Sequence, residues 1–125
     1  MQNLIYALIQ VGHNFGATAI VAVAAYGAWC VGGRRARRTA LLLAALWALQ
    51  AFTGALFGTA TYLFDHHLPD IHGVAVKALF IKMGCAVLGL ALALYSAKSG
   101  RPLWGFSLLL GLTALGSAAF LRWFS

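Results

Sequence analysis

The stretch ALLLAALWALQAFTGALFGTATYLF, residues 40–64, contains no charged side chain and decides the fold. A helix needs roughly 20 predominantly apolar residues to cross about 30 Å of hydrocarbon, since each residue rises about 1.5 Å. Three more stretches of this kind are present, so we expect transmembrane helices at about 4–31, 40–64, 73–97 and 103–124. The sequence therefore predicts an all-α fold, a four-helix transmembrane bundle that forms one domain over residues 1–125.

The composition agrees with an integral membrane protein and leaves little chain for anything else. Of the 125 residues, 62% are hydrophobic and only 9% are charged, an excess of apolar side chains that soluble domains rarely have. The segments between the expected helices are short, so no separate catalytic domain is expected. Any function must lie inside the bundle or at its connections, and the sequence leaves open whether the protein is an enzyme.

The charged residues are sorted by connection. Nine Lys and Arg stand against two acids, a formal net charge of +7. The first connection holds an arginine run and the third holds two more cations, namely Arg34, Arg35, Arg37, Arg38, Lys98 and Arg101. The second connection holds Asp65 and Asp70 and no Lys or Arg. The positive-inside rule therefore predicts that both chain ends lie on the non-cytoplasmic side.

The basic charge does not predict a nucleic-acid partner. The arginine run is short and lacks the interleaved aromatic side chains on which bases stack. The expected surroundings are a lipid bilayer. No partner of the nucleic-acid class is expected.

Polar side chains inside the expected helices are the candidates for function, because a charged group at the bilayer centre costs roughly 2.5–3.5 kcal/mol on insertion scales. Gln10, His13 and Asn14 share one face of the first helix, at spacing i, i+3, i+4. His13 is expected about 15 Å below the outer end of its helix. Lys77 and Lys82 are expected roughly 7 Å and 15 Å below the start of the third helix, which places Lys82 and His13 at one depth.

The two lysines and the histidine differ in what their depth allows. Lys77 can extend its ammonium group to the outer surface along its apolar stem. Lys82 is too deep for that, and either becomes neutral or meets an anion or a polar cavity. His13 is either a neutral imidazole bonded to the second helix through Gln50 or a backbone carbonyl, or a ligand of haem iron or copper.

The second connection adds three histidines, which are His66, His67 and His72. They are either ordinary exposed loop residues or ligands of a divalent or cuprous ion. Two chemistries then fit the outer half of the bundle. One is a b-type haem with imidazole ligands and cations for its propionates, drawn from His13, His72, Lys77, Lys82 and Arg122. The other is copper, held by imidazoles with softer ligands deeper in, drawn from His13, His66, His67, His72, Met83 and Cys85.

Two segments carry a resemblance to known membrane proteins. The run Gly12-His13-Asn14-Phe15-Gly16-Ala17, and the run from His72-Gly73 through Lys82 to Tyr95, resemble the copper resistance protein D (CopD) family. They also resemble the HemJ-type membrane proteins, which pair a helix-one histidine with a helix-three lysine. The resemblance implies copper import or a haem-linked function in a bacterial inner (plasma) membrane, carried by His13 and Lys82.

The leading hypothesis is a small polytopic inner-membrane protein with a histidine-based metal or haem b site in the outer half of the bundle. Such a site would serve copper handling or membrane electron transfer. The alternative is a non-catalytic structural or assembly subunit of a larger respiratory or photosynthetic membrane complex. Small-residue faces such as Gly54 and Gly58 would then dock on a partner, or on a second copy in a homo-oligomer. Proton-coupled transport through His13 is a third interpretation.

Overall fold

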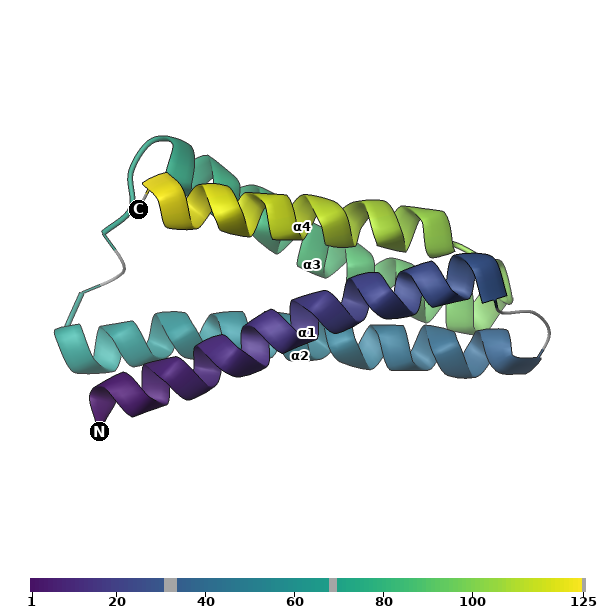
Figure 1. Ribbon diagram of the computed structural model, residues 1–125, viewed down its shortest axis with the longest axis horizontal. Helices are drawn as coiled ribbons and strands as arrows, with labels where there is room; N and C mark the ends of the chain where they lie inside the picture. Colours follow the sequence, from purple (N-terminus) through teal and green to yellow (C-terminus); the bar gives the residue numbers. More distant parts are fainter. Residues whose placement is uncertain (31–33, 68–69, 125) are drawn as a thin grey trace.

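The computed structural model contains four long helices in its described part, which covers residues 1–30, 34–67 and 70–124. They are α1 (Gln2–Cys30), α2 (Arg34–Asp65), α3 (Val74–Ser99) and α4 (Trp104–Phe124). Figure 1 shows them as two antiparallel hairpins lying side by side, α1 with α2 and α3 with α4. Each helix contains a segment long and apolar enough to cross a membrane, which confirms the all-α transmembrane bundle.

The four helices form a ring in which each helix packs along two neighbours. Within the described residues, α1 packs against α2 and α4, and α3 packs against α2 and α4. We call the end with Arg34 to Arg38 and Lys98 to Arg101 the basic end. The opposite end, with Asp65 to His72, is the histidine end, and both chain termini lie there (Figure 1).

The second helix begins earlier than the sequence predicted. Its first residue is Arg34 rather than a residue near 40, so the arginines expected in a loop occupy its first turns. Arg and Ala are good helix formers, and a helix that leaves the hydrocarbon can continue into the headgroup region without losing backbone hydrogen bonds. Thr39 donates its hydroxyl hydrogen back to the Arg35 carbonyl at 2.9 Å within this segment. The predicted end of the first helix, at residue 31, lies outside the described residues.

The third helix runs to Ser99 rather than to residue 97, and a glycine ends it. Gly100 has φ 71°, in the left-handed region, and its N–H donates to the Ser96 carbonyl at 3.0 Å. Glycine adopts this conformation without the steric cost that other residues carry. The other bounds agree with the prediction to within a few residues.

Dense packing is concentrated between the middle of the bundle and the basic end. Trp47 is fully buried, and its indole ring lies so close to Gly89 of α3 that an added Cβ would overlap it. Trp104 of α4 makes a similar contact with Gly27 of α1, where a Cβ would approach within 2.7 Å. Glycine on one helix thus makes room for an indole from another, and the helices pack closely around these two contacts.

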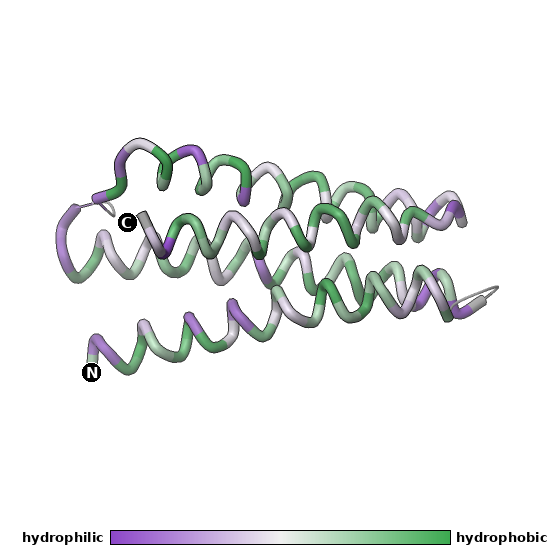
Figure 2. The backbone as a smooth tube through the Cα atoms, turned by 45° about the horizontal axis from the view of Figure 1, so that its top comes forward, coloured by the Kyte–Doolittle hydropathy of each residue, from purple (hydrophilic) through white to green (hydrophobic). Residues whose placement is uncertain are grey.

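Toward the histidine end the two hairpins diverge, as Figures 1 and 2 both show. The buried residues of α1 are Gly16, Ile20, Ala24 and Gly27, all in the half nearer the basic end. The first half of α1 is held mainly to α2: Gln2 and Tyr6 donate to the Asp65 carboxylate, each at 3.3 Å.

The outer faces of the helices are apolar. Large side chains such as Phe15, Phe80, Val87 and Phe106 are exposed on all sides of the bundle. Such faces fit contact with a lipid bilayer, since burial in lipid replaces burial in a protein core. Figure 2 shows the hydrophilic residues gathered at the two ends and in the halves of α1 and α3 that lie nearer the histidine end.

Candidate functional site

The imidazole of His13 joins α1 to α2 through both of its ring nitrogens. Nδ1 lies 2.7 Å from the Thr53 hydroxyl oxygen, and Nε2 lies 2.8 Å from the Gln50 amide nitrogen. Gln50 and Thr53 are three residues apart on α2, so they share one face of the helix and can both hydrogen-bond to one imidazole ring. This confirms the interpretation in which His13 is bonded to the second helix through Gln50.

The partners determine which nitrogen carries the hydrogen. An amide nitrogen only donates, so the Gln50 amide donates to His13 Nε2, which accepts. The Thr53 hydroxyl donates its own hydrogen to the Leu49 carbonyl at 2.8 Å, so its oxygen is left to accept from His13 Nδ1–H. His13 is therefore the neutral Nδ1–H tautomer, and both nitrogens are occupied by the protein.

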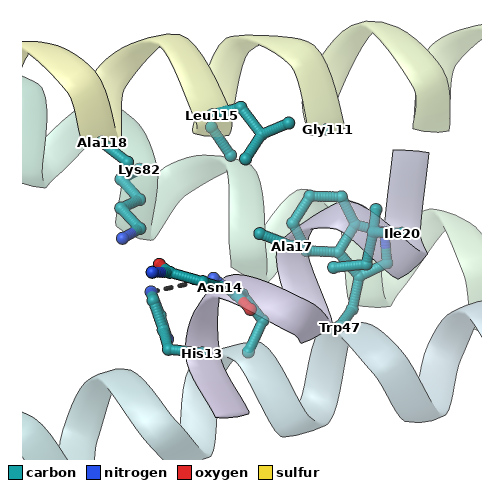
Figure 3. Close-up of a pocket in the computed structure, with 11 residues that line it drawn as sticks. His13, Asn14, Ala17, Ile20, Trp47, Lys82, Gly111, Leu115 and Ala118 are labelled. Carbon is teal, nitrogen blue, oxygen red and sulfur yellow. Dashed lines mark hydrogen bonds between the residues drawn. The ribbon is translucent and has the colours of Figure 1, made fainter. Parts of the chain in front are cut away.

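A small cavity lies beside this linkage, between the two hairpins. Its volume is about 30 Å³, room for about two water molecules. All four helices contribute to its wall, which consists of His13, Asn14, Ala17, Ile20, Trp47, Gln50, Lys82, Gly111, Ala114, Leu115 and Ala118. Figure 3 shows the Lys82 side chain reaching from α3 toward the ends of Asn14 and His13.

Lys82 brings a basic side chain to this cavity, and no Asp or Glu side chain among the described residues pairs with it. It is half-buried, and its position two turns into α3 places it about 12 Å below the start of that helix. The whole sequence has two acidic side chains, and both are engaged at the histidine end. Asp65 accepts from Gln2 and Tyr6, and Asp70 pairs with His72 at 2.6 Å.

Two buried polar atoms of the cavity wall have no hydrogen-bond partner among the residues that the structure describes. They are Gln50 Oε1, an acceptor, and Trp47 Nε1, a donor. A buried polar group without a partner costs about 1–3 kcal/mol, and such groups are commonly served by water or a ligand.

The structure brings only some of the predicted site residues together. His13 and Lys82 line one cavity, as their equal depth predicted, whereas Lys77 is exposed and does not line it. His72 is 86% exposed in its pair with Asp70, and His66 and His67 are also exposed near the end of α2. Across the described ranges, no three His, Cys, Asp or Glu side chains lie close enough to hold a metal ion.

Haem or copper on His13 does not fit this arrangement as it stands. Haem iron or copper would bind His13 through a ring nitrogen, so one of the two hydrogen bonds from His13 to α2 would have to break. The cavity also has room for about two water molecules, far less than a porphyrin needs. Metal or haem binding by His13, His66, His67 and His72 stays a prediction.

Sequence patterns pointed to one α2 residue of the cavity wall, Gln50, but not to Trp47 or to the small residues of α4. Nothing in them distinguishes Trp47 from the other apolar residues of the second helix. The available signal was the spacing of Gly111, Ala114 and Ala118, small residues that recur on one helix face. Small side chains there leave the space that Lys82 and Asn14 border.

Comparison of the chain with protein-family models, with curated proteins and with solved structures gives no match. The fold and the site therefore define a class only, a multi-pass helical membrane protein with a small cavity between two hairpins. The likeness to the CopD and HemJ-type proteins stays a resemblance of the segments around His13 and Lys82.

Proposed function

We propose that this membrane protein binds a small anion in the cavity between His13 and Lys82. The observation that carries the proposal is the half-buried Lys82 side chain beside that cavity, in a chain whose two acidic side chains are both engaged elsewhere. A charged side chain inside a membrane helix is costly and normally marks a ligand or ion site. An anion would supply the missing opposite charge.

The surrounding residues have distinct roles in this proposal. Lys82 provides the charge, and the Asn14 amide, which lies at the exposed rim, can donate hydrogen bonds to the same ligand. His13 does not touch the anion through a ring nitrogen. It acts as a positioning residue, because its bonds to Gln50 and Thr53 fix α1 against α2. The size of the cavity favours chloride, bromide or formate over a larger anion.

The orientation in the membrane is part of the proposal. The basic end carries six of the nine Lys and Arg, Arg34, Arg35, Arg37, Arg38, Lys98 and Arg101, which favours a cytoplasmic location for that end. The cavity would then be reached from the non-cytoplasmic side, where the hairpins diverge. Closure around Trp47 and Gly89 would separate it from the cytoplasm. The resemblance of the segments around His13 and Lys82 to the CopD and HemJ-type proteins favours a bacterial inner membrane as the location.

Anion titration of the purified protein tests the function. The protein is prepared in detergent with gluconate as the only anion, and chloride, bromide or formate is added while thermal stability and tryptophan fluorescence are followed. Trp47 lines the cavity, so a bound anion should change its emission. We expect saturable responses that Lys82→Gln weakens about ten- to a hundredfold, the loss of one charged hydrogen bond.

Lys77→Gln is the matched control, since Lys77 lies on the same helix but is exposed and outside the cavity wall. It should leave the anion response unchanged. Equal responses in wild type and Lys82→Gln would overturn the proposal. The structural-subunit hypothesis would then be preferred, and copurification of a stable partner would support it.

Copper or haem b gives different signals in the same preparation. A Soret band in the visible spectrum that His13→Ala abolishes would support haem, and stoichiometric copper by elemental analysis would support copper. Either result would mean that the His13 linkage opens to release a ring nitrogen. Haem or copper would then replace the anion as the proposed ligand of the protein.

Cysteine labelling tests the orientation. Cys30 is exposed at the end of α1 nearest the basic end, whereas Cys85 is buried. A membrane-impermeant maleimide should label Cys30 in inside-out vesicles and not in intact spheroplasts. A His66→Cys variant that also lacks Cys30 should show the opposite pattern, because His66 is exposed at the histidine end. Labelling of Cys30 in intact spheroplasts would reverse the proposed orientation.

A further inference from the structure

A second hollow lies at the basic end, far along the bundle from the His13 and Lys82 cavity. It is a groove of about 450 Å³ between α2 and α3, lined by Arg37, Leu41, Leu94, Ala97 and Lys98. Its lining has two cations and three apolar side chains, and the cations come from different helices. The anion cavity does not account for this groove, since the two share no lining residue.

The two helices present the same pattern to the groove. On α2, Arg37 precedes Leu41 by four residues, and on α3, Leu94 precedes Lys98 by four. Residues four apart lie above one another on a helix face. Because α2 runs away from the basic end and α3 runs toward it, both cations lie at the level of the bundle end and both leucines lie one turn deeper.

The charge around the groove is of one sign. Arg35, Arg38 and Arg101 are exposed near Arg37 and Lys98, and both acids of the chain lie at the other end of the bundle. No ion pair of Arg37 or Lys98 occurs in the part of the chain that the structure describes. Long basic side chains at a helix end extend into the lipid headgroup region, where basic pockets between helices bind anionic headgroups.

We propose that this groove binds one anionic phospholipid. The phosphate lies between Arg37 and Lys98, and an acyl chain follows Leu41, Leu94 and Ala97 toward the bilayer centre. The apolar floor distinguishes this ligand from free phosphate, which would leave Leu41 and Leu94 without a contact. The volume agrees, because 450 Å³ exceeds what an inorganic anion fills. The site is independent of the anion cavity and of the orientation of the protein in the membrane.

Native mass spectrometry of the purified protein tests the proposal. The protein in detergent is mixed with phosphatidylglycerol or with phosphatidylcholine of the same acyl chains, and the retained lipid is counted. We expect one phosphatidylglycerol to be retained in preference to phosphatidylcholine. The double variant Arg37→Gln, Lys98→Gln should lose at least about tenfold in affinity, as expected when two charge-assisted contacts are removed. The variant Arg37→Lys, Lys98→Arg should retain the lipid.

Arg35→Gln is the matched control, because Arg35 is exposed on the same turn of α2 but does not line the groove. It removes one charge and should change the affinity little. Circular dichroism and gel filtration of each variant verify that the bundle is intact. Inorganic phosphate added at millimolar excess should fail to displace the lipid.

Three results would overturn the proposal. Equal retention of the two lipids would show that the groove does not select charge. Unchanged affinity in the double variant would place the lipid elsewhere on the protein. Displacement by inorganic phosphate alone would identify the groove as a free-phosphate site.

Discussion

His13 Nδ1 donates to the Thr53 hydroxyl oxygen at 2.7 Å, and this bond joins the first transmembrane helix to the second at the depth of the cavity that Lys82 lines. Thr53 is buried, so the bond is shielded from solvent. In this geometry the ring belongs to the framework of the bundle. Lys82 is left as the charged group that faces the cavity.

Removing the Thr53 hydroxyl should destabilise the bundle. Thr53→Val keeps the shape of the side chain but leaves His13 Nδ1–H without an acceptor, which costs about 1–3 kcal/mol. The measurement is the free energy of unfolding in mixed detergent micelles. Thr59→Val is the control, because Thr59 is exposed on the same helix and bonds only to the Ala55 carbonyl at 2.9 Å. Equal losses in the two variants would show that the His13 linkage does not contribute.

Adding one methyl group at Gly89 should also destabilise the fold. A Cβ at this position overlaps the buried Trp47 indole, so Gly89→Ala forces α3 away from α2 and costs about 1–3 kcal/mol by overpacking. Gly84→Ala on the same helix meets no neighbouring atom and should be neutral or slightly stabilising. Thermal unfolding of both proteins checks the difference. Combining Gly89→Ala with Trp47→Phe should recover part of the loss, and a lack of recovery would locate the clash elsewhere.

Lys82→Met should make the protein more stable while removing anion binding. The substitution replaces a half-buried cation that has no carboxylate partner with an apolar side chain of similar length, and we expect a gain of about 1 kcal/mol or more. Opposite changes in stability and binding are typical of a residue kept for function. Lys77→Met, at the exposed position, should change neither quantity much. A large loss of stability in Lys82→Met would mean that Lys82 is a structural residue.

Gly100→Ala should weaken the turn between α3 and α4. Gly100 has φ 71°, where an L side chain costs about 1–2 kcal/mol. Gly100→Asn should cost less, since Asn tolerates the left-handed region. Gly105→Ala, within α4 and with open space around its Cβ position, is the comparison. The free energies of unfolding should rank Gly100→Ala lowest, and any other order would contradict the capping role.

The histidines illustrate how far sequence can go toward the site. Depth along each helix follows from residue number, so the sequence alone places His13 and Lys82 at one level. Whether His72 reaches the same site depends on how the second connection folds, and that is a tertiary question. The structure pairs His72 with Asp70 at the surface instead. The partners of His13 were predictable in part: a bond to the second helix through Gln50 was one of the expected interpretations, whereas the bond to Thr53 was not expected.

Four membrane-spanning helices follow from the sequence alone, because a backbone in hydrocarbon must satisfy its hydrogen bonds within each segment, and length and hydropathy then suffice. The tertiary structure decided the rest. Rotation of each helix about its axis aims Lys82 at the cavity and leaves Lys77 exposed, and it seats Trp47 on Gly89. That rotation depends on the contacts of all four helices at once, since in an apolar environment close packing rather than hydrophobic patterning selects the buried face.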